Sequence, residues 1–132
     1  MRATGRDFNR FNETAKQAIR WVSGGDDAWI SDFFRADLGR ESITYSWPEA
    51  DENDELAVLS ITIQLGDDLA ETYGNAAKAF REKERNFREI SARPDISDDG
   101  RSNLNYTADD LGMVAGFFDD ALRCQCGVEL AA

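Results

Sequence analysis

The chain has 132 residues, of which 42% are hydrophobic and 11% aromatic, so it can form a core and is too apolar for a disordered tail. Its 15 lysine and arginine residues face 26 aspartate and glutamate residues, which gives a formal net charge of −11 at pH 7. This acidity argues against direct binding of nucleic acid and against docking on an anionic membrane. Histidine is absent, which excludes histidine-based triads, histidine acid–base mechanisms and histidine zinc sites.

The compartment is predicted from what the sequence lacks. The first residues carry no apolar run of the kind that forms a signal peptide, and no stretch approaches the roughly 18 apolar residues of a membrane span. Cys124 and Cys126 are two positions apart, so a disulfide between them would be strained. We therefore expect reduced thiols and a cytoplasmic protein.

Apolar spacing of three and four residues predicts two helices in the first third of the chain. The first helix carries its apolar face from Phe8 to Val22 and ends at Gly24-Gly25. Asp26 is placed to cap the second helix, which is short and very apolar over residues 29–38 and ends at Gly39.

The period then changes to two, which predicts a pair of strands. Apolar residues alternate with serine, threonine and glutamine over Ile43–Trp47 and again over Leu59–Leu65, and antiparallel pairing of these runs forms a hairpin. Residues 48–53 are the expected loop. One alternative stays open, because apolar residues also keep helical spacing here, and residues 54–91 could form one long helix of an all-α bundle.

Two more helices are predicted in the second half of the chain. A long helix starts at Asp67 or Asp68 and ends before Pro94. After a turn-rich loop, Thr107 followed by Asp110 resembles a capping box and predicts the start of the last helix. The predicted fold class is therefore α+β: a helix-rich single domain over residues 1–132, in the order α-α-β-β-α-α, with an antiparallel two-stranded hairpin.

The negative charge is concentrated in two blocks on either side of a basic helix. Residues 48–75 carry a net charge of −8 and residues 94–132 carry −6, whereas residues 76–93 carry +3. Part of this acidity lies at expected helix starts, where carboxylates cap free N–H groups and need no partner. The carboxylates at the expected helix starts can therefore be ordinary solvated surface residues, and they do not indicate a binding site.

Helix capping does not explain two acidic groups. One is the predicted hairpin loop, and the other is a pair in the second half of the last helix, where the dipole disfavours negative charge. An acidic surface of this kind favours a basic partner. Trp47, if exposed beside the loop, is a candidate hot spot, and its other interpretation is the end of a core-facing strand. The candidate partner-binding residues are Trp47, Glu49, Asp51, Glu52, Asp54, Glu55, Asp119 and Asp120.

Metal and cofactor motifs are incomplete. The segment from Asp95 to Gly100 matches the start of a calcium loop, but position twelve is Tyr106, which cannot supply the bidentate carboxylate. Cys124 and Cys126 offer two of the four ligands that zinc requires. No glycine-rich phosphate loop follows a strand. We therefore predict no metal, no cofactor and no catalytic residue.

The sequence favours a binding protein: an inhibitor whose carboxylate face occupies the basic groove of a nucleic-acid-handling protein, with carboxylates in place of phosphates. In size, acidity and small α+β make-up, the chain is similar to phage anti-CRISPR and anti-restriction inhibitors and to bacterial immunity proteins that neutralise nuclease toxins. The alternative is a structural or assembly factor or oligomer subunit, in which open sheet edges pair across a homodimer. A carboxylate- or metal-dependent enzyme ranks third.

Overall fold

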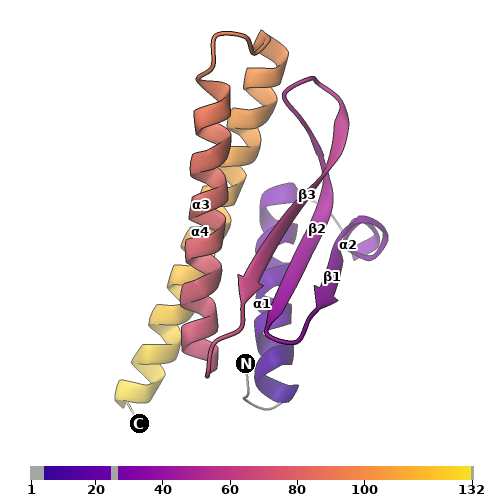
Figure 1. Ribbon diagram of the computed structural model, residues 1–132. Helices are drawn as coiled ribbons and strands as arrows, with labels where there is room; N and C mark the ends of the chain where they lie inside the picture. The colour runs from indigo at the N-terminus through magenta and orange to yellow at the C-terminus, as the bar shows by residue number, and fades with distance from the viewer. Residues whose placement is uncertain (1–4, 25–26, 132) are drawn as a thin grey trace.

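The computed structural model describes residues 5–24 and 27–131, with side chains over 8–24 and 28–124, and confirms the α+β class with helices predominant. The elements are α1 (Gly5–Ser23), α2 (Asp27–Phe33), β1 (Arg35–Leu38), β2 (Ser42–Ala50), β3 (Leu56–Gln64), α3 (Leu69–Ser91) and α4 (Asp98–Ala131). The helices α3 and α4 lie side by side along one flank of the sheet, and α1 packs behind it (Figure 1). The β2–β3 hairpin points toward the end of the molecule where α3 connects to α4 (Figure 1).

The sheet is antiparallel, with the strand order β1-β2-β3. Its register confirms the predicted pairing of the two alternating runs, because Ile43 lies opposite Ile63 and Trp47 lies opposite Leu59. The apolar side chains at alternate positions, from Ile43 to Trp47 and from Leu59 to Ile63, face the helices. The serine and threonine side chains between them face outward, as do Leu56 and Val58 near the loop. Since β3 is a strand, the alternative of one continuous helix over residues 54–91 is wrong.

The strand β1 was not predicted, because residues 35–38 were expected to continue the second helix. That helix ends at Phe33, and the ring of Phe34 stacks on Tyr45 with 5.2 Å between centroids. Insertion of Phe34 into the core draws the following residues along β2. In β1 the backbone groups of residues 35–38 form hydrogen bonds with β2, which take the place of the bonds they would have formed in a longer helix.

Pro48 lies inside β2, not in the loop, which consists of residues 51–55. It pairs with Val58 of β3, but it lies beyond the last residue of β2 that β1 reaches, which is Ser46. Proline has no N–H to donate, so it is tolerated where a strand has a neighbour on one side only. The short length of β1 therefore permits a proline in the middle strand.

The last helix begins at Asp98, so the capping box predicted at Thr107 is wrong. The true cap is Ser97, whose Oγ accepts the N–H of Gly100 at 3.0 Å. Asp98 and Asp99 then lie in the first turn, where the helix dipole favours negative charge. The predicted start of α3 is confirmed by its cap Asp68, whereas the expected cap at Asp26 lies outside the described residues.

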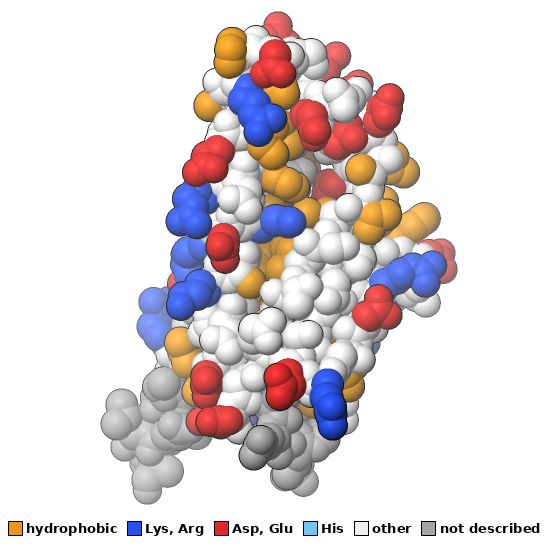
Figure 2. Space-filling view, viewed as in Figure 1, with side chains coloured by type: hydrophobic (Ala, Val, Ile, Leu, Met, Phe, Trp, Pro, Cys, Tyr) orange, Lys and Arg blue, Asp and Glu red, His pale blue; other side chains and the backbone are white. Residues whose placement is uncertain are grey.

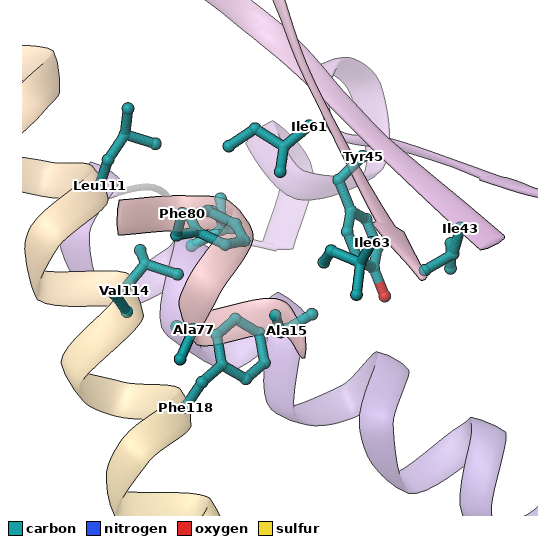
Figure 3. Close-up of a cluster of buried hydrophobic side chains, with 14 of the residues drawn as sticks. Ala15, Ile43, Tyr45, Ile61, Ile63, Ala77, Phe80, Leu111, Val114 and Phe118 are labelled. Carbon is teal, nitrogen blue, oxygen red and sulfur yellow. The ribbon is translucent and has the colours of Figure 1, made fainter. Parts of the chain in front are cut away.

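One hydrophobic core joins the inner face of the sheet to α1, α3 and α4 (Figure 3). Phe11 of α1 lies 5.7 Å from the ring of Phe118, which lies 5.6 Å from Phe80 of α3. Tyr45 is buried among them, and its hydroxyl donates a hydrogen bond to Asn12 Oδ1 at 2.8 Å. Burial raises the pKa of the Tyr45 phenol. In the described part of the chain, no helix is both long and apolar enough to cross a bilayer.

Candidate functional site

The loop between β2 and β3 is stabilised by one of its own carboxylates. Asp51 Oδ1 accepts the backbone N–H of Asn53 at 2.9 Å and that of Glu55 at 3.0 Å. Asp54 has a φ of 57°, in the left-handed region that aspartate adopts more readily than most residues. Asp51, predicted as a partner contact, therefore also fixes the conformation of the loop.

This loop packs on the first turns of α4. Asn103 Nδ2 donates hydrogen bonds to Asp54 Oδ1 at 2.8 Å and to the Asp51 carbonyl at 3.3 Å. A Cβ atom built on Gly100 would lie 1.9 Å from the Glu52 carbonyl oxygen, so the two backbones are in direct contact. The loop is consequently fixed to the helix rather than projecting into solvent.

The contact brings two acidic segments, residues 51–55 and 95–99, to one end of the molecule. We call this surface the acidic end, and its residues are Asp51, Glu52, Asp54, Glu55, Asp95, Asp98 and Asp99. Figure 2 shows acidic side chains gathered there. Arg101 lies beside them, but its guanidinium donates to the carbonyls of Ser91 at 2.7 Å and Arg93 at 3.0 Å. It also forms an ion pair at 3.8 Å with the fully exposed Asp98 carboxylate, and solvent screens this pair.

A pocket of about 310 Å³ adjoins the acidic end, between the hairpin and α3. We call it the hairpin groove, and it is lined by Glu49, Ala50, Asp51, Glu52, Ala57, Val58, Leu59, Ser60, Lys83, Phe87 and Leu104. Figure 2 shows hydrophobic side chains along this hollow, with acidic side chains above it. Its size is at the lower limit of small-ligand pockets, and it combines apolar side chains with an acidic rim.

Glu49 is half-buried and lies on the inner face of the sheet, where polar groups of the core bind it. Its Oε1 accepts the indole N–H of Trp47 at 2.9 Å, and its Oε2 accepts the hydroxyl of Thr107 at 3.5 Å. Burial raises the pKa of Glu49, and both hydrogen bonds oppose that shift. The carboxylate is therefore tied to both β2 and α4.

Asp110 of α4 is a further carboxylate in this region that sequence reasoning missed, because it was interpreted as part of a helix cap. Burial raises the pKa of Asp110 to about 6, with smaller contributions from the charges of Glu49 and Asp109. Glu49 and Asp110 line one cavity of about 10 Å³. That volume is far below what an organic substrate requires, so the pair has no room for one there.

Trp47 is buried, with 5% of its side chain exposed, so it is not an exposed hot spot beside the loop. Its ring stacks on Phe80 with 6.4 Å between centroids, and it lies 5.8 Å from the ring of Phe34. The interpretation of Trp47 as the end of a core-facing strand is the correct one. It contributes to the site through its hydrogen bond to Glu49 rather than as a contact surface.

Asp119 and Asp120 do not share a surface with the acidic end. The two lie 19 and 20 residues beyond Gly100 on α4, which is about 28 Å or more along a helix axis. Asp119 forms an ion pair with Arg81 of α3, and Asp120 forms one with Arg123. Basic side chains therefore lie against both carboxylates and compensate the acidity that helix capping does not explain.

The fold and the site together define a small, helix-rich α+β protein with an acidic end and an adjoining apolar groove. No protein-family model, no curated protein and no solved structure matches the chain. Within the side chains that the structure describes, no three metal-ligand residues are grouped so that they could hold an ion. The segment compared with a calcium loop is helical from Asp98 onward. Cys124 is an exposed free thiol, and the side chain of Cys126 lies outside the described residues.

Proposed function

We propose that this chain is a protein-binding inhibitor whose acidic end occupies the basic groove of a nucleic-acid-handling protein. The observation that carries the proposal is the backbone contact between Glu52 and Gly100, which unites two acidic segments in one surface. Carboxylates held on a packed scaffold can take the place of phosphates, and their field accelerates association with a cationic partner. A cytoplasmic location and an anti-CRISPR, anti-restriction or nuclease-immunity role are parts of the same proposal.

The hairpin groove supports a particular mode of contact. An arginine or lysine side chain has an apolar stem and a charged tip, and the groove has the matching arrangement of surfaces. Phe87 offers apolar surface for the stem, and Glu49 offers a carboxylate for a charge-assisted hydrogen bond. Lys83 also lines the groove and opposes the entry of cations, so we expect no more than one basic side chain to insert, next to Glu49.

Charge reversal at Glu52 and Glu55 tests the proposal. Neither carboxylate takes part in a hydrogen bond that the structure describes, unlike that of Asp51. The variant Glu52→Lys/Glu55→Lys changes the net charge from −11 to −7, since each substitution adds two charges. Glu55 is exposed and Glu52 is partly exposed, so the unfolding free energy of this variant should change by about 0.5 kcal/mol or less, as is usual for substitutions outside the core.

A matched control has the same net charge with the substitutions elsewhere. In Glu82→Lys/Glu89→Lys, both altered residues are exposed on α3. A tagged protein is used to capture the partner from a native lysate at low and moderate salt, and the identified partner is then purified. Association rates are measured from about 50 to about 500 mM salt, a range over which screening lengths fall severalfold.

We expect Glu52→Lys/Glu55→Lys, the hairpin variant, to associate more slowly than the wild type and with a weaker salt dependence. The control on α3, Glu82→Lys/Glu89→Lys, should associate nearly as fast as the wild type. Nucleic acid should compete with the wild type for the partner. Binding that is unaffected by salt and by the hairpin variant would contradict the proposal. Equal slowing in both variants would also contradict it, since the effect would then come from net charge alone.

A further inference from the structure

Among the residues that the structure describes, no strand pairs with the outer edge of β1. The strand β1 lies at the end of the order β1-β2-β3, and its four residues are exposed. An unpaired edge is a template for another strand, and proteins commonly protect such an edge with charged side chains. The charged residues of β1 are Arg35 and Asp37. Because they carry opposite charges two positions apart, β1 is also complementary to an antiparallel copy of itself.

The register determines which backbone groups of β1 face the open side. The N–H of Gly39 donates to the carbonyl of Ser42 at 2.8 Å, so the backbone groups of Gly39 face β2. Along an antiparallel strand, successive residues direct these groups to alternate sides. The N–H and C=O groups of Leu38 and Ala36, one and three residues from Gly39, therefore face away from β2.

We propose that β1 pairs antiparallel with β1 of a second copy of this chain, about a two-fold axis at Ala36. Each Ala36 then lies opposite its own copy, and the two residues exchange a pair of backbone hydrogen bonds. The N–H of Leu38 lies opposite the carbonyl of Phe34 in the second copy. The Phe34 N–H is already used within its own chain, because it donates to the Ile30 carbonyl at 3.1 Å.

The side chains of β1 are complementary in this register. Arg35 lies opposite Asp37 of the second copy, and the two-fold axis repeats the pair. Both residues project from the outward face, since they pair with Ser46 and Thr44 of β2. They occupy the pairs without mutual hydrogen bonds, in which facing side chains approach most closely. Two ion pairs therefore flank the small central Ala36.

The opposite face and the neighbouring registers favour the same arrangement. Leu38, which is 59% exposed, lies opposite Phe34 of the second copy and gains apolar contact. A two-fold axis at Arg35 or at Asp37 would place two like charges opposite each other, which is unfavourable. The next register whose axis lies at a residue with outward-facing backbone groups is centred on Leu38. That register would put Asp37 opposite an uncharged Gly39 and Arg35 opposite the turn between β1 and β2. The centre at Ala36 is therefore the self-complementary one.

Sedimentation velocity and light scattering of the full chain, from about 1 μM to about 1 mM, measure the association. We expect a dimer that forms with rising concentration. Arg35→Glu places like charges opposite each other twice, as does Asp37→Arg, so each variant should raise the dissociation constant at least about tenfold. The double variant Arg35→Glu/Asp37→Arg restores opposite charges and should return it to within about threefold of the wild type.

Ala36→Pro provides an independent test of the backbone pairing. The substitution removes an N–H that faces outward and is not used by β2, a position that proline tolerates in an edge strand. Circular dichroism and melting should match the wild type while dimerisation is lost. A chain that stays monomeric at every concentration overturns the proposal, and so does a dimer that is unaffected by the charge variants. If the proline variant fails to fold, the recovery of the dimer in the charge-swapped double variant decides.

Discussion

The carbonyl oxygen of Glu52 lies against Gly100, where a Cβ atom would come within 1.9 Å of it. Both groups belong to the backbone, so no change of rotamer could relieve the overlap that a side chain would create. The same approach places Asn103 within hydrogen-bonding distance of Asp54. The acidic end therefore depends on the absence of a side chain at one position of α4.

Gly100→Ala should lower the free energy of unfolding by about 1–3 kcal/mol, the usual cost of forcing atoms into a packed contact. The sign is informative, because alanine favours a helix over glycine by up to about 1 kcal/mol. Gly116→Ala is the control in the same helix: beyond that helix's own backbone and the adjacent residues, the structure describes no atom within 4 Å of a Cβ placed there, so this variant should be stabilised. Urea unfolding measures the free energy of unfolding of both variants. If both are stabilised or both are destabilised, the contact between Gly100 and Glu52 does not exclude a side chain at position 100.

Substitutions at Asp51 separate its hydrogen bonds from its charge. Asp51→Ala removes the acceptor of two backbone N–H groups and should cost about 1 kcal/mol, as the loss of a capping side chain does. Asp51→Asn keeps the Oδ1 acceptor and removes the charge, so it should retain most of the stability. Thermal unfolding compares the two, and equal losses would show that charge, not hydrogen bonding, stabilises the loop.

Most of the fold follows from patterns that are local in sequence. The runs at Ile43–Trp47 and Leu59–Leu65 alternate because one face of each strand is buried, and that signal needs no knowledge of the partner. The segment Arg35–Leu38 carries no such signal. It is a strand because Phe34 enters the core and β2 offers free backbone groups, both of which are tertiary facts. The start of α4 was missed because the sequence at residues 97–100 is equally typical of a turn.

The site was predictable only in part, for the same reason. The acidity of residues 51–55 is visible in the sequence, but their proximity to residues 95–99 depends on the close approach at Gly100. The pairing of Asp119 with Arg81 depends on how α3 and α4 are rotated about their axes. Hydrophobic periodicity indicates which face of a helix is buried, but it does not specify the ion pairs at the boundary of that face.

A double-mutant cycle on Arg81 and Asp119 measures that ion pair. Both side chains are partly exposed, so the coupling free energy from Arg81→Ala, Asp119→Ala and the double variant should be about 0.2–1 kcal/mol. Because exposed charges are screened, the coupling should fall as salt is raised to about 1 M. Urea unfolding at low and high salt gives both values. No coupling at low salt would show that Asp119 is stabilised by other groups.

The raised pKa of Asp110 makes the stability of the protein depend on pH. The pKa of Asp110 is about 6 in the folded protein, against an ordinary value of 3.8. Between these two pH values the folded protein therefore retains a proton that the unfolded chain has released. The contribution of Asp110 to the free energy of unfolding should therefore fall as the pH rises through this window, and protonation should restore it. Asp110→Asn removes the partly buried charge and should melt at a higher temperature than the wild type at neutral pH.

The difference in melting temperature between Asp110→Asn and the wild type should become smaller as the pH falls to about 4. At that pH the wild-type carboxyl is protonated in the folded protein, so neither protein carries a charge at this position. Asp120→Asn is the control, because Asp120 is exposed on the same helix and pairs with Arg123. Its melting temperature at neutral pH should differ little from that of the wild type, because its side chain is exposed. If Asp110→Asn is instead less stable than the wild type at neutral pH, the ionised carboxylate makes a favourable contact, and burial does not dominate its energetics.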